Sequence, residues 1–358
     1  MTTIIVVNPG ATSTKVAQYQ DDKMVWKEEI TYTPEQLAPF TKVFDQFDLR
    51  LQDIQDLLKK HEVEKIDLAV GRGGLIGPVK PGAILVNDAL IKHLQDHPIL
   101  EHPSNLGAKL AKALMDKFGQ GQAAYIYDPV TVDSMKPVSR LTGIKGIERT
   151  STGHHLNMRA VARKAAQDLG KAYEDINLVI VHVGGGSTAS AHEHGQVIDF
   201  VSDDEIMFSA ERSGGMPVKS MLKVIKEIGV DNFNQLARKK AGLQSHCQTA
   251  DLRDVEKRIS QGDQEAALVF DALALGIAKT IATLAVSIDG PVDLVCLTGG
   301  MAYSEKLCQA VAARTSFIGP FKAYPGEFEL EALALGGLRV IKGQESYQEL
   351  DFPMDINS

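Results

Sequence analysis

The stretch TIIVVNPGATSTKVAQYQDDKMVWKEEIT, residues 3–31, contains strand, turn, strand, turn and strand in immediate succession. Its apolar run 3–7 predicts a buried strand, and the alternating runs 14–19 and 25–31 predict two half-exposed strands. The first connection, NPGATST, is far longer than the two residues that suffice for a tight hairpin. Because it is rich in backbone N–H donors and hydroxyl groups, and Lys15 follows it, the turn is suited to hold a phosphate group.

The same pattern returns in NLVIVHVGGGSTASAHEHGQVIDF, residues 177–200. A single glycine-rich hairpin is more often just a hairpin. Two such turns in equivalent positions predict a duplicated α/β architecture in which each half contributes a phosphate-binding turn. Neither turn has the spacing of a Walker loop, and each leads into a strand instead of a helix.

Between and after these strands, segments with helical periodicity alternate with further short apolar runs. Helices are predicted at about 41–60, 88–95, 104–118, 154–170, 216–228, 252–260, 264–288 and 329–342, and further strands at 68–70, 123–129 and 293–297. We predict two domains: residues 1–149 with the C-terminal helix and tail from about 329 to 358, and residues 150–328.

Composition excludes several classes of protein. The 358 residues have a net charge of −8, which gives no support to a nucleic-acid or membrane-surface partner. The three cysteines form no Cys-x-x-Cys pair and favour a reducing compartment. The first apolar run is too short for a signal peptide, and no run of 18 apolar residues occurs. We therefore expect a soluble, cytoplasmic protein.

Seven motifs, in the order in which the family has them, carry a resemblance to the acetokinase family. They are NPGATSTK, HPSNLGAKLA, YIYDPV, HVGGGS, ERSGGMP, TGGMAYSE and YPGEFELEALALG. The resemblance covers about residues 3–342 and is greatest to butyrate-using members. It implies the duplicated ribonuclease H-like (actin-like ATPase) fold, with two domains and an active-site cleft between them. It also implies ATP/ADP and Mg²⁺ as cofactors and a homo-oligomer, a dimer or larger.

The reaction that the resemblance implies is ATP-dependent phosphorylation of a short-chain carboxylate, butyrate above all, to an acyl phosphate and ADP. Transfer would be direct and in line, and reversible, often toward ATP. Gly73 and Gly74 are expected to leave room for a four-carbon tail, although isobutyrate, propionate and acetate remain alternatives. More remote alternatives are an actin-like ATPase switch and a family member that binds nucleotide without turnover.

Four residues match the catalytic positions of the family: Arg72, Asp128, His154 and Arg212. Guanidinium groups suit the negative charge of a phosphoryl group in transfer. Competing interpretations are an ion pair with Glu211 for Arg212, an Asp-Pro turn for Asp128, and His155 instead of His154. His102 also matches a family histidine, with a structural role almost as favoured.

Further positions are assigned by the resemblance to nucleotide and metal. The nucleotide set is Asn8, Ser13, Lys15, Gly184, Gly185, Gly186, Asp251, Leu252, Arg253, Gly299, Gly300 and Met301. The metal set is Asn8, Asp128 and one of Glu329 and Glu331, with Glu329 favoured by the simple alignment.

Overall fold

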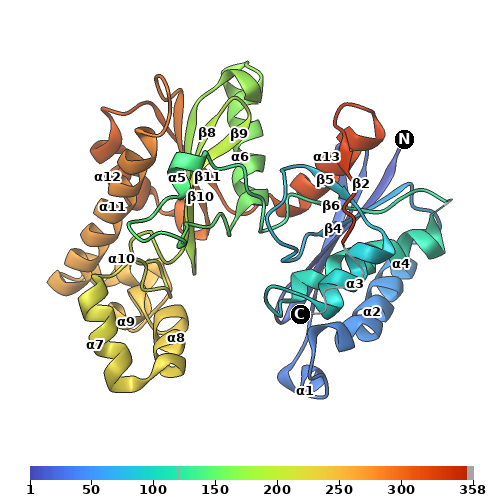
Figure 1. The fold of residues 1–358 in the computed structure, drawn as a ribbon, viewed down its shortest axis with the longest axis horizontal. Coiled ribbons are helices and arrows are strands. Elements are labelled where there is room, and N and C mark those ends of the chain that lie inside the picture. The colour runs from blue at the N-terminus through green and yellow to red at the C-terminus, as the bar shows by residue number, and fades with distance from the viewer. Residues whose placement is uncertain (120, 353–358) are drawn as a thin grey trace. The chain divides into compact units, whose positions relative to one another are not determined.

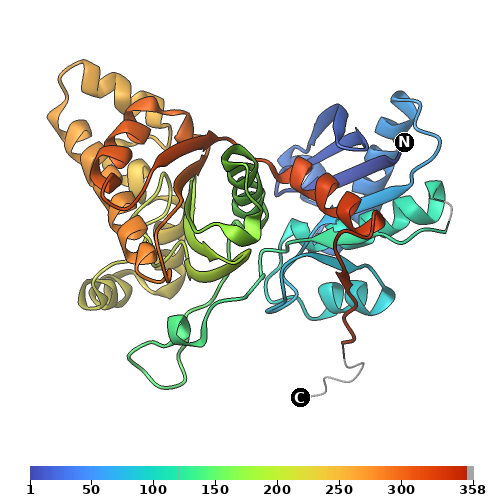
Figure 2. The same cartoon turned by 90° about the horizontal axis from the view of Figure 1, so that it is seen from above.

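The computed structural model describes residues 1–119 and 121–352 and divides the chain into two compact units (Figures 1 and 2). The first unit comprises Met1–Asp133 and the C-terminal part from Phe328, and the second comprises Ser134–Glu327. The division falls earlier than residue 149 because the intervening segment is bonded to the second unit. Lys136 N donates to Ile198 O at 2.9 Å, and Arg149 pairs with Asp199 at 2.9 Å. It stays a prediction that the N-terminal domain is the acyl-kinase domain and that the second domain binds the nucleotide.

In the described residues, the first unit contains a sheet of seven strands. Their spatial order is β12 (Tyr347–Gln348), β5 (Ala83–Leu85), β6 (Tyr125–Tyr127), β4 (Leu68–Arg72), β1 (Thr3–Pro9), β2 (Ser13–Gln20) and β3 (Lys23–Thr31). Strands β1, β2 and β3 are antiparallel, whereas β4 runs parallel to both β1 and β6. In this register Asn8 lies opposite Lys15, so the two side chains share one face of the sheet.

Helices cover both faces of this sheet (Figure 1). One face, which includes Ile5 and Val7, packs against α2 (Phe47–Lys60), α3 (Asp88–Asp96) and α4 (Leu106–Phe118). The other face packs against α13 (Glu329–Ile341), where a Cβ atom on Gly337 would meet Val70 and Leu68. The shorter helices of this unit are α1 (Pro34–Leu37), η1 (Val43–Gln46) and η2 (Pro103–Asn105).

The second unit repeats the strand order of the first. Among the described residues its sheet has five strands, in the order β11 (Phe321–Pro325), β10 (Leu294–Gly299), β7 (Leu178–Val183), β8 (Ser187–Glu193) and β9 (Gln196–Val201). The antiparallel set β7–β8–β9 corresponds to β1–β2–β3, and the parallel strands β10 and β11 correspond to β4 and β6. The predicted duplication is thus present in the strand topology.

Helices also cover both faces of the second sheet. Helix α6 (His155–Leu169) lies on the face that carries His182, and α10 (Leu252–Ser260), α11 (Gln264–Ala285) and α12 (Glu305–Thr315) contribute to the core on the other. The remaining helices are α5 (Pro137–Arg140), η3 (Tyr173–Asp175), α7 (Val218–Ile228), α8 (Val230–Lys239), α9 (Gly242–Cys247) and η4 (Gly300–Tyr303).

Helix α11 is, by length and composition, long and apolar enough to cross a membrane. In the structure one face of the helix, with Leu273, Ile277 and Ile281, is buried in the core of the second unit, whereas Leu268 and Leu275 are exposed. This core position accounts for its composition.

His192 in β8 makes the stability of the second unit depend on pH. Its ring is fully buried and bonds the Tyr173 hydroxyl and Ser190 Oγ, each at 2.7 Å. Burial, with smaller effects from the charges of Arg159 and His155, holds the pKa of His192 well below its usual value. The unfolded chain therefore binds the proton first, and the free energy of unfolding falls as the pH decreases below about 6.5, by about 1 kcal/mol per pH unit.

Urea unfolding of the wild type and His192→Gln between pH 7.5 and 5.5 tests this. The variant cannot titrate at position 192, so its stability should decline less steeply with acidification. Equal pH slopes for the two proteins would contradict the assignment. Other buried histidines contribute to both proteins alike, so the difference in slope isolates His192.

Candidate active site

Asn8, Arg72 and Glu329 converge in the first unit, although they are far apart in the sequence. Asn8 lies near the end of β1, Arg72 ends the neighbouring parallel strand β4, and Glu329 begins α13. Asn8 Nδ2 donates to Glu329 Oε2 at 2.6 Å, and Arg72 Nη1 forms an ion pair with Glu329 Oε1. The Arg72 side chain is only 9% exposed, which makes it a fixed, largely desolvated cation.

Arg50 fixes the turn between β1 and β2, and sequence reasoning missed it. This fully buried side chain donates from Nη2 to Gly10 O and from Nη1 to Ser13 O, each at 3.0 Å. Nη1 also donates to Thr14 Oγ1 at 2.8 Å, and the guanidinium lies over the ring of Tyr32. Arg50 therefore fixes the conformation of the turn that is predicted to bind phosphate.

Ser13 and Lys15, both predicted to bind phosphate, lie on the same face of the sheet as Asn8. Lys15 stands opposite Asn8 and Glu29 in the ladder, and Ser13 Oγ donates to Glu29 Oε1 at 2.6 Å. The negative charge of Glu331 lies near the phenol of Tyr19 and contributes, after burial, to raising the pKa of that tyrosine to about 12. Glu329, and not Glu331, is the glutamate that bonds Asn8 and Arg72.

Asp128 is buried beside a loop of the first unit, whereas His102, the N-cap of η2, keeps much of its surface exposed. Asp128 has a positive φ of 39° directly after β6, and its Oδ1 accepts from Gly82 N at 2.8 Å. His102 Nδ1 accepts from Ser104 N at 3.2 Å. Burial, and then the positive charge of Arg72, lower the pKa of His102. Both effects favour the neutral form of the His102 imidazole.

Our interpretation of Gly73 and Gly74 as room for an acyl tail was wrong. A Cβ atom on Gly73 would lie 2.5 Å from Pro129 Cβ, and one on Gly74 would lie 2.7 Å from Asn105 Cα. Asn105 lies against this segment because its Oδ1 accepts a hydrogen bond from Leu75 N at 2.9 Å. The two glycines permit close packing of the backbone, and the space beside them is already filled.

Two adjacent histidines in the second unit have different environments. His155 has no exposed surface, its Nε2 lies 3.1 Å from Ser151 O, and its ring stacks on Phe200. His154, at the N-terminal end of α6, is only partly buried, and its Nδ1 lies 3.0 Å from Thr188 Oγ1. This difference supports His154 as the candidate for phosphoryl contact.

His182, which sequence reasoning did not select, stacks on His154 with ring centroids 3.9 Å apart and planes within 5°. Asn157 Nδ2 donates to His182 Nδ1 at 3.0 Å and to Thr298 Oγ1 at 3.2 Å. Because Nδ1 accepts, the proton of a neutral His182 lies on Nε2. The HVGGG motif contained the only sequence signal for this residue.

The glycine turn between β7 and β8 is hydrogen-bonded, through its backbone carbonyl groups, to the loop that carries Arg212. Ala210 N donates to Gly184 O at 3.3 Å, and Glu211 N donates to Gly185 O at 3.0 Å. Arg212 lies against Gly186, with its Nε 3.6 Å from Asp203 Oδ2 and its Nη1 3.8 Å from Glu211 Oε2. The ion pair with Glu211 that we considered is thus present, and Arg212 also lies at the turn.

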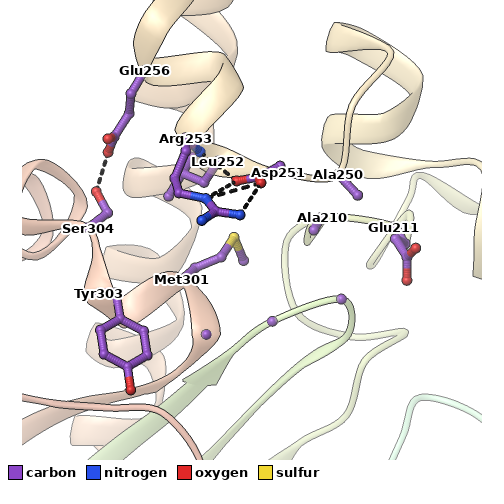
Figure 3. Close-up of a pocket in the computed structure, with 13 residues that line it drawn as sticks. Ala210, Glu211, Ala250, Asp251, Leu252, Arg253, Glu256, Met301, Tyr303 and Ser304 are labelled. Carbon is purple, nitrogen blue, oxygen red and sulfur yellow. Dashed lines mark hydrogen bonds and ion pairs between the residues drawn. The ribbon is translucent and has the colours of Figure 1, made fainter. Parts of the chain in front are cut away.

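A pocket of about 660 Å³ opens beside this turn in the second unit (Figure 3). Seven of the residues predicted to bind nucleotide line it: Gly184, Gly185, Asp251, Leu252, Arg253, Gly300 and Met301. Gly186 and Gly299 are not in the lining. Gly299 has a φ of 89°, and a Cβ atom there would collide with the carbonyl of Val183, so its role is close backbone approach.

The wall of the pocket carries an ion pair between Asp251 and Arg253 and several polar groups. Asp251 caps α10 by accepting from Arg253 N at 2.9 Å, and Arg253 Nη2 bonds its Oδ2 at 2.6 Å. These bonds, first that from the Arg253 side chain, lower the pKa of Asp251. Sequence reasoning missed four polar lining residues: Glu211, Glu256, Tyr303 and Ser304.

In residues 1–119 and 121–352 no group of three or more His, Cys, Asp or Glu side chains could hold a metal ion. A metal cage made entirely of such side chains is therefore missing from the described chain. Asn8 and Glu329 can offer oxygen ligands only as part of a site completed by other molecules.

Comparison with known proteins gives three consistent findings. The profile of the acetokinase family matches residues 136–323. The chain is 39% identical over 349 residues to a probable butyrate kinase of Enterococcus faecalis, covering 96% of each chain. It is 38% identical over 352 residues to butyrate kinase 1 of Clostridium acetobutylicum, covering 97% of this chain and 99% of the relative.

The crystal structure of Porphyromonas gingivalis acetate kinase shares the fold, with a TM-score of 0.78 at 17% identity. The alignment covers 95% of this chain and 100% of that one. The predicted fold class is thereby confirmed. Similarity over nearly the whole length, together with the family profile, shows that the chain belongs to the acetokinase family.

Proposed function

We propose that the protein is an ATP-dependent kinase of short-chain carboxylates, with butyrate as its main acid substrate. The observation that carries the proposal is the nucleotide-sized pocket that ends on the glycine turn Gly184–Gly185. The two butyrate kinases to which the chain is similar over nearly its full length support the choice of acid. The reaction converts butyrate and ATP to butyryl phosphate and ADP, and it is reversible.

A carboxylate is a competent nucleophile at neutral pH, so the reaction needs no general base. One carboxylate oxygen attacks the γ-phosphorus, and the bond from that phosphorus to the bridging oxygen of ADP breaks. The main obstacle is repulsion between two anions, which fixed cations reduce. Arg72, Lys15 and Arg212 are the cations that we propose for this role. His154 donates a hydrogen bond to the phosphoryl oxygens.

Magnesium fits this proposal as an ion that arrives with the nucleotide. Mg²⁺ is commonly bound by one or two protein oxygens, with waters and phosphates completing its shell. Asn8 and Glu329, in contact at 2.6 Å, would supply protein oxygens, with Asp128 as a further candidate and Glu331 as the alternative glutamate. The ion would neutralise phosphate charge during transfer.

Preference for four carbons rests on the relatives, because the space beside Gly73 and Gly74 is filled. Propionate, isobutyrate and acetate are the competing acids. A difference of one methylene in an apolar pocket changes specificity by about 10- to 200-fold. A clear optimum is therefore expected within a series of acids.

Hydroxylamine trapping of acyl phosphate with MgATP and acetate, propionate, butyrate, isobutyrate or valerate tests the proposal. We expect the largest kcat/KM for butyrate, and loss of product when EDTA removes Mg²⁺. An optimum at acetate would replace butyrate and leave the reaction class standing. If none of the acids gives product while ADP still binds, an actin-like switch or an inactive nucleotide-binding protein becomes the better assignment.

Cytoplasmic location and a dimeric or larger assembly belong to the same proposal. The net charge of −8 supports neither a nucleic-acid nor a membrane partner. Light scattering on the purified protein would measure its assembly directly.

A further inference from the structure

Glu256 and Ser304 form a hydrogen-bonded pair at one end of the pocket in the second unit. In Figure 3 this pair lies on the opposite side from Ala210 and Glu211, with Arg253 and Met301 between. Ala210 and Glu211 bond the Gly184–Gly185 turn, so that side is the phosphate end. A nucleotide with its phosphates at the turn would extend its base toward Glu256 and Ser304.

The positions of both oxygens are fixed by the fold. Ser304 is the N-cap of α12, where its Oγ accepts from Leu307 N at 3.0 Å, and its hydroxyl proton is donated to Glu256 Oε1. Glu256 itself lies on α10, directly after the buried Val255. The serine hydroxyl is thus occupied as donor and acceptor, and it holds the carboxylate in place.

The Glu256 carboxylate, which is partly buried, has few partners. Within residues 1–119 and 121–352 it forms no ion pair, and Ser304 is its one hydrogen-bond partner, through Oε1. A carboxylate only accepts hydrogen bonds, and Oε2 has no partner among the described residues. The Oε2 atom therefore favours a ligand that presents an N–H group at this end of the pocket.

Resting on the proposed nucleotide site, we propose that Glu256 selects adenine by accepting a hydrogen bond from its 6-amino group. With Oε1 engaged by Ser304, one oxygen remains, and one exocyclic amino group matches it. Guanine presents N1–H and its 2-amino group side by side and needs both carboxylate oxygens. Hypoxanthine and guanine would also direct their 6-oxo groups at a negative charge. The pocket therefore discriminates against 6-oxo purine nucleotides.

ATP and ITP provide a matched pair of substrates, because they share ribose and phosphates and differ at purine position 6 and in the N1 proton. We expect the wild type to prefer ATP by about 10- to 100-fold in kcat/KM, the range for a hydrogen bond to a charged group. Glu256→Gln can present either an oxygen or an amino group, so its preference should fall to within about threefold. Glu305→Gln, an exposed neighbour of Ser304, is the matched control and should keep the wild-type preference.

Calorimetric binding of ADP and IDP, without any acid, separates this inference from the proposed reaction. A wild-type preference for ADP that is lost in Glu256→Gln supports base selection even if no acid is phosphorylated. Acyl phosphate formed equally well from ATP and ITP by the wild type would overturn base selection and leave the kinase proposal intact. A folded Glu256→Gln variant that keeps the full wild-type preference would also overturn it.

Discussion

Replacing Arg72 by alanine is expected to lower kcat/KM for acyl phosphate formation about 10³-fold, with most of the loss in kcat. Arg72 is a largely buried cation at the end of β4, fixed by its ion pair with Glu329. Its charge should matter most when negative charge spreads over the transferring phosphoryl oxygens. Lysine cannot reproduce the two-point contact of a guanidinium, so Arg72→Lys should recover only part of the activity.

The Arg72→Ala variant also leaves the Glu329 carboxylate without its cation, which should lower the free energy of unfolding by about 2 kcal/mol. The double variant Arg72→Ala/Glu329→Gln removes that charge and should recover stability without recovering activity. Because Glu329 is itself a proposed magnesium ligand, steady-state kinetics and urea unfolding are measured on the wild type, Arg72→Ala, Glu329→Gln and the double variant, which separates the two effects. If the double variant regained activity together with stability, Arg72 would be only a structural residue.

Replacing Arg50 by methionine is expected to lower the free energy of unfolding by about 3 kcal/mol, because buried acceptors lose their donors. Gly10 O, Ser13 O and Thr14 Oγ1 all receive hydrogen bonds from this guanidinium. Amide hydrogen exchange should accelerate in residues 10–15, because the turn is no longer held in one conformation. Because the turn is predicted to bind phosphate, the KM for MgATP should rise as well.

Lys59→Met on the same helix is the matched control for Arg50, since Lys59 is exposed. A surface change of this kind should alter stability by no more than about 0.5 kcal/mol. Arg50→Lys should retain part of the stability, since one ammonium can reach some of the carbonyl groups. Unchanged exchange in residues 10–15 of a folded Arg50→Met protein would show that the turn keeps its conformation without this support.

The fold was largely predictable because its elements are long and strongly patterned. The predicted helix at 252–260 coincides with α10, and Gly170 ends α6 in the left-handed conformation that its sequence position indicates. The three-residue strand β5 and the partly exposed strand β11 lacked a comparable pattern and were missed. Short elements of this kind depend on neighbouring strands that a local pattern does not identify.

The site was less predictable because its geometry depends on distant contacts. Arg50 has the sequence context of a solvated helix residue, yet its partners are backbone carbonyls that carry no residue-specific signal. The sequence shows that Gly73 and Gly74 have no side chain, but only the structure shows that Pro129 and Asn105 fill the adjoining space. Residue size alone therefore did not reveal whether a cavity exists.

The return of α13 to the first unit has a consequence for protein synthesis. Glu329, the partner of Arg72 and Asn8, and the helix that covers one face of the first sheet are encoded after the entire second unit. On the ribosome, the second unit can complete its contacts while the first still exposes an apolar sheet face. The first unit can therefore be completed only after the second unit has been synthesised, unlike the usual N-terminal-first order of domain folding. A nascent chain that stops before residue 329 would have an intact nucleotide pocket and an unfinished first unit.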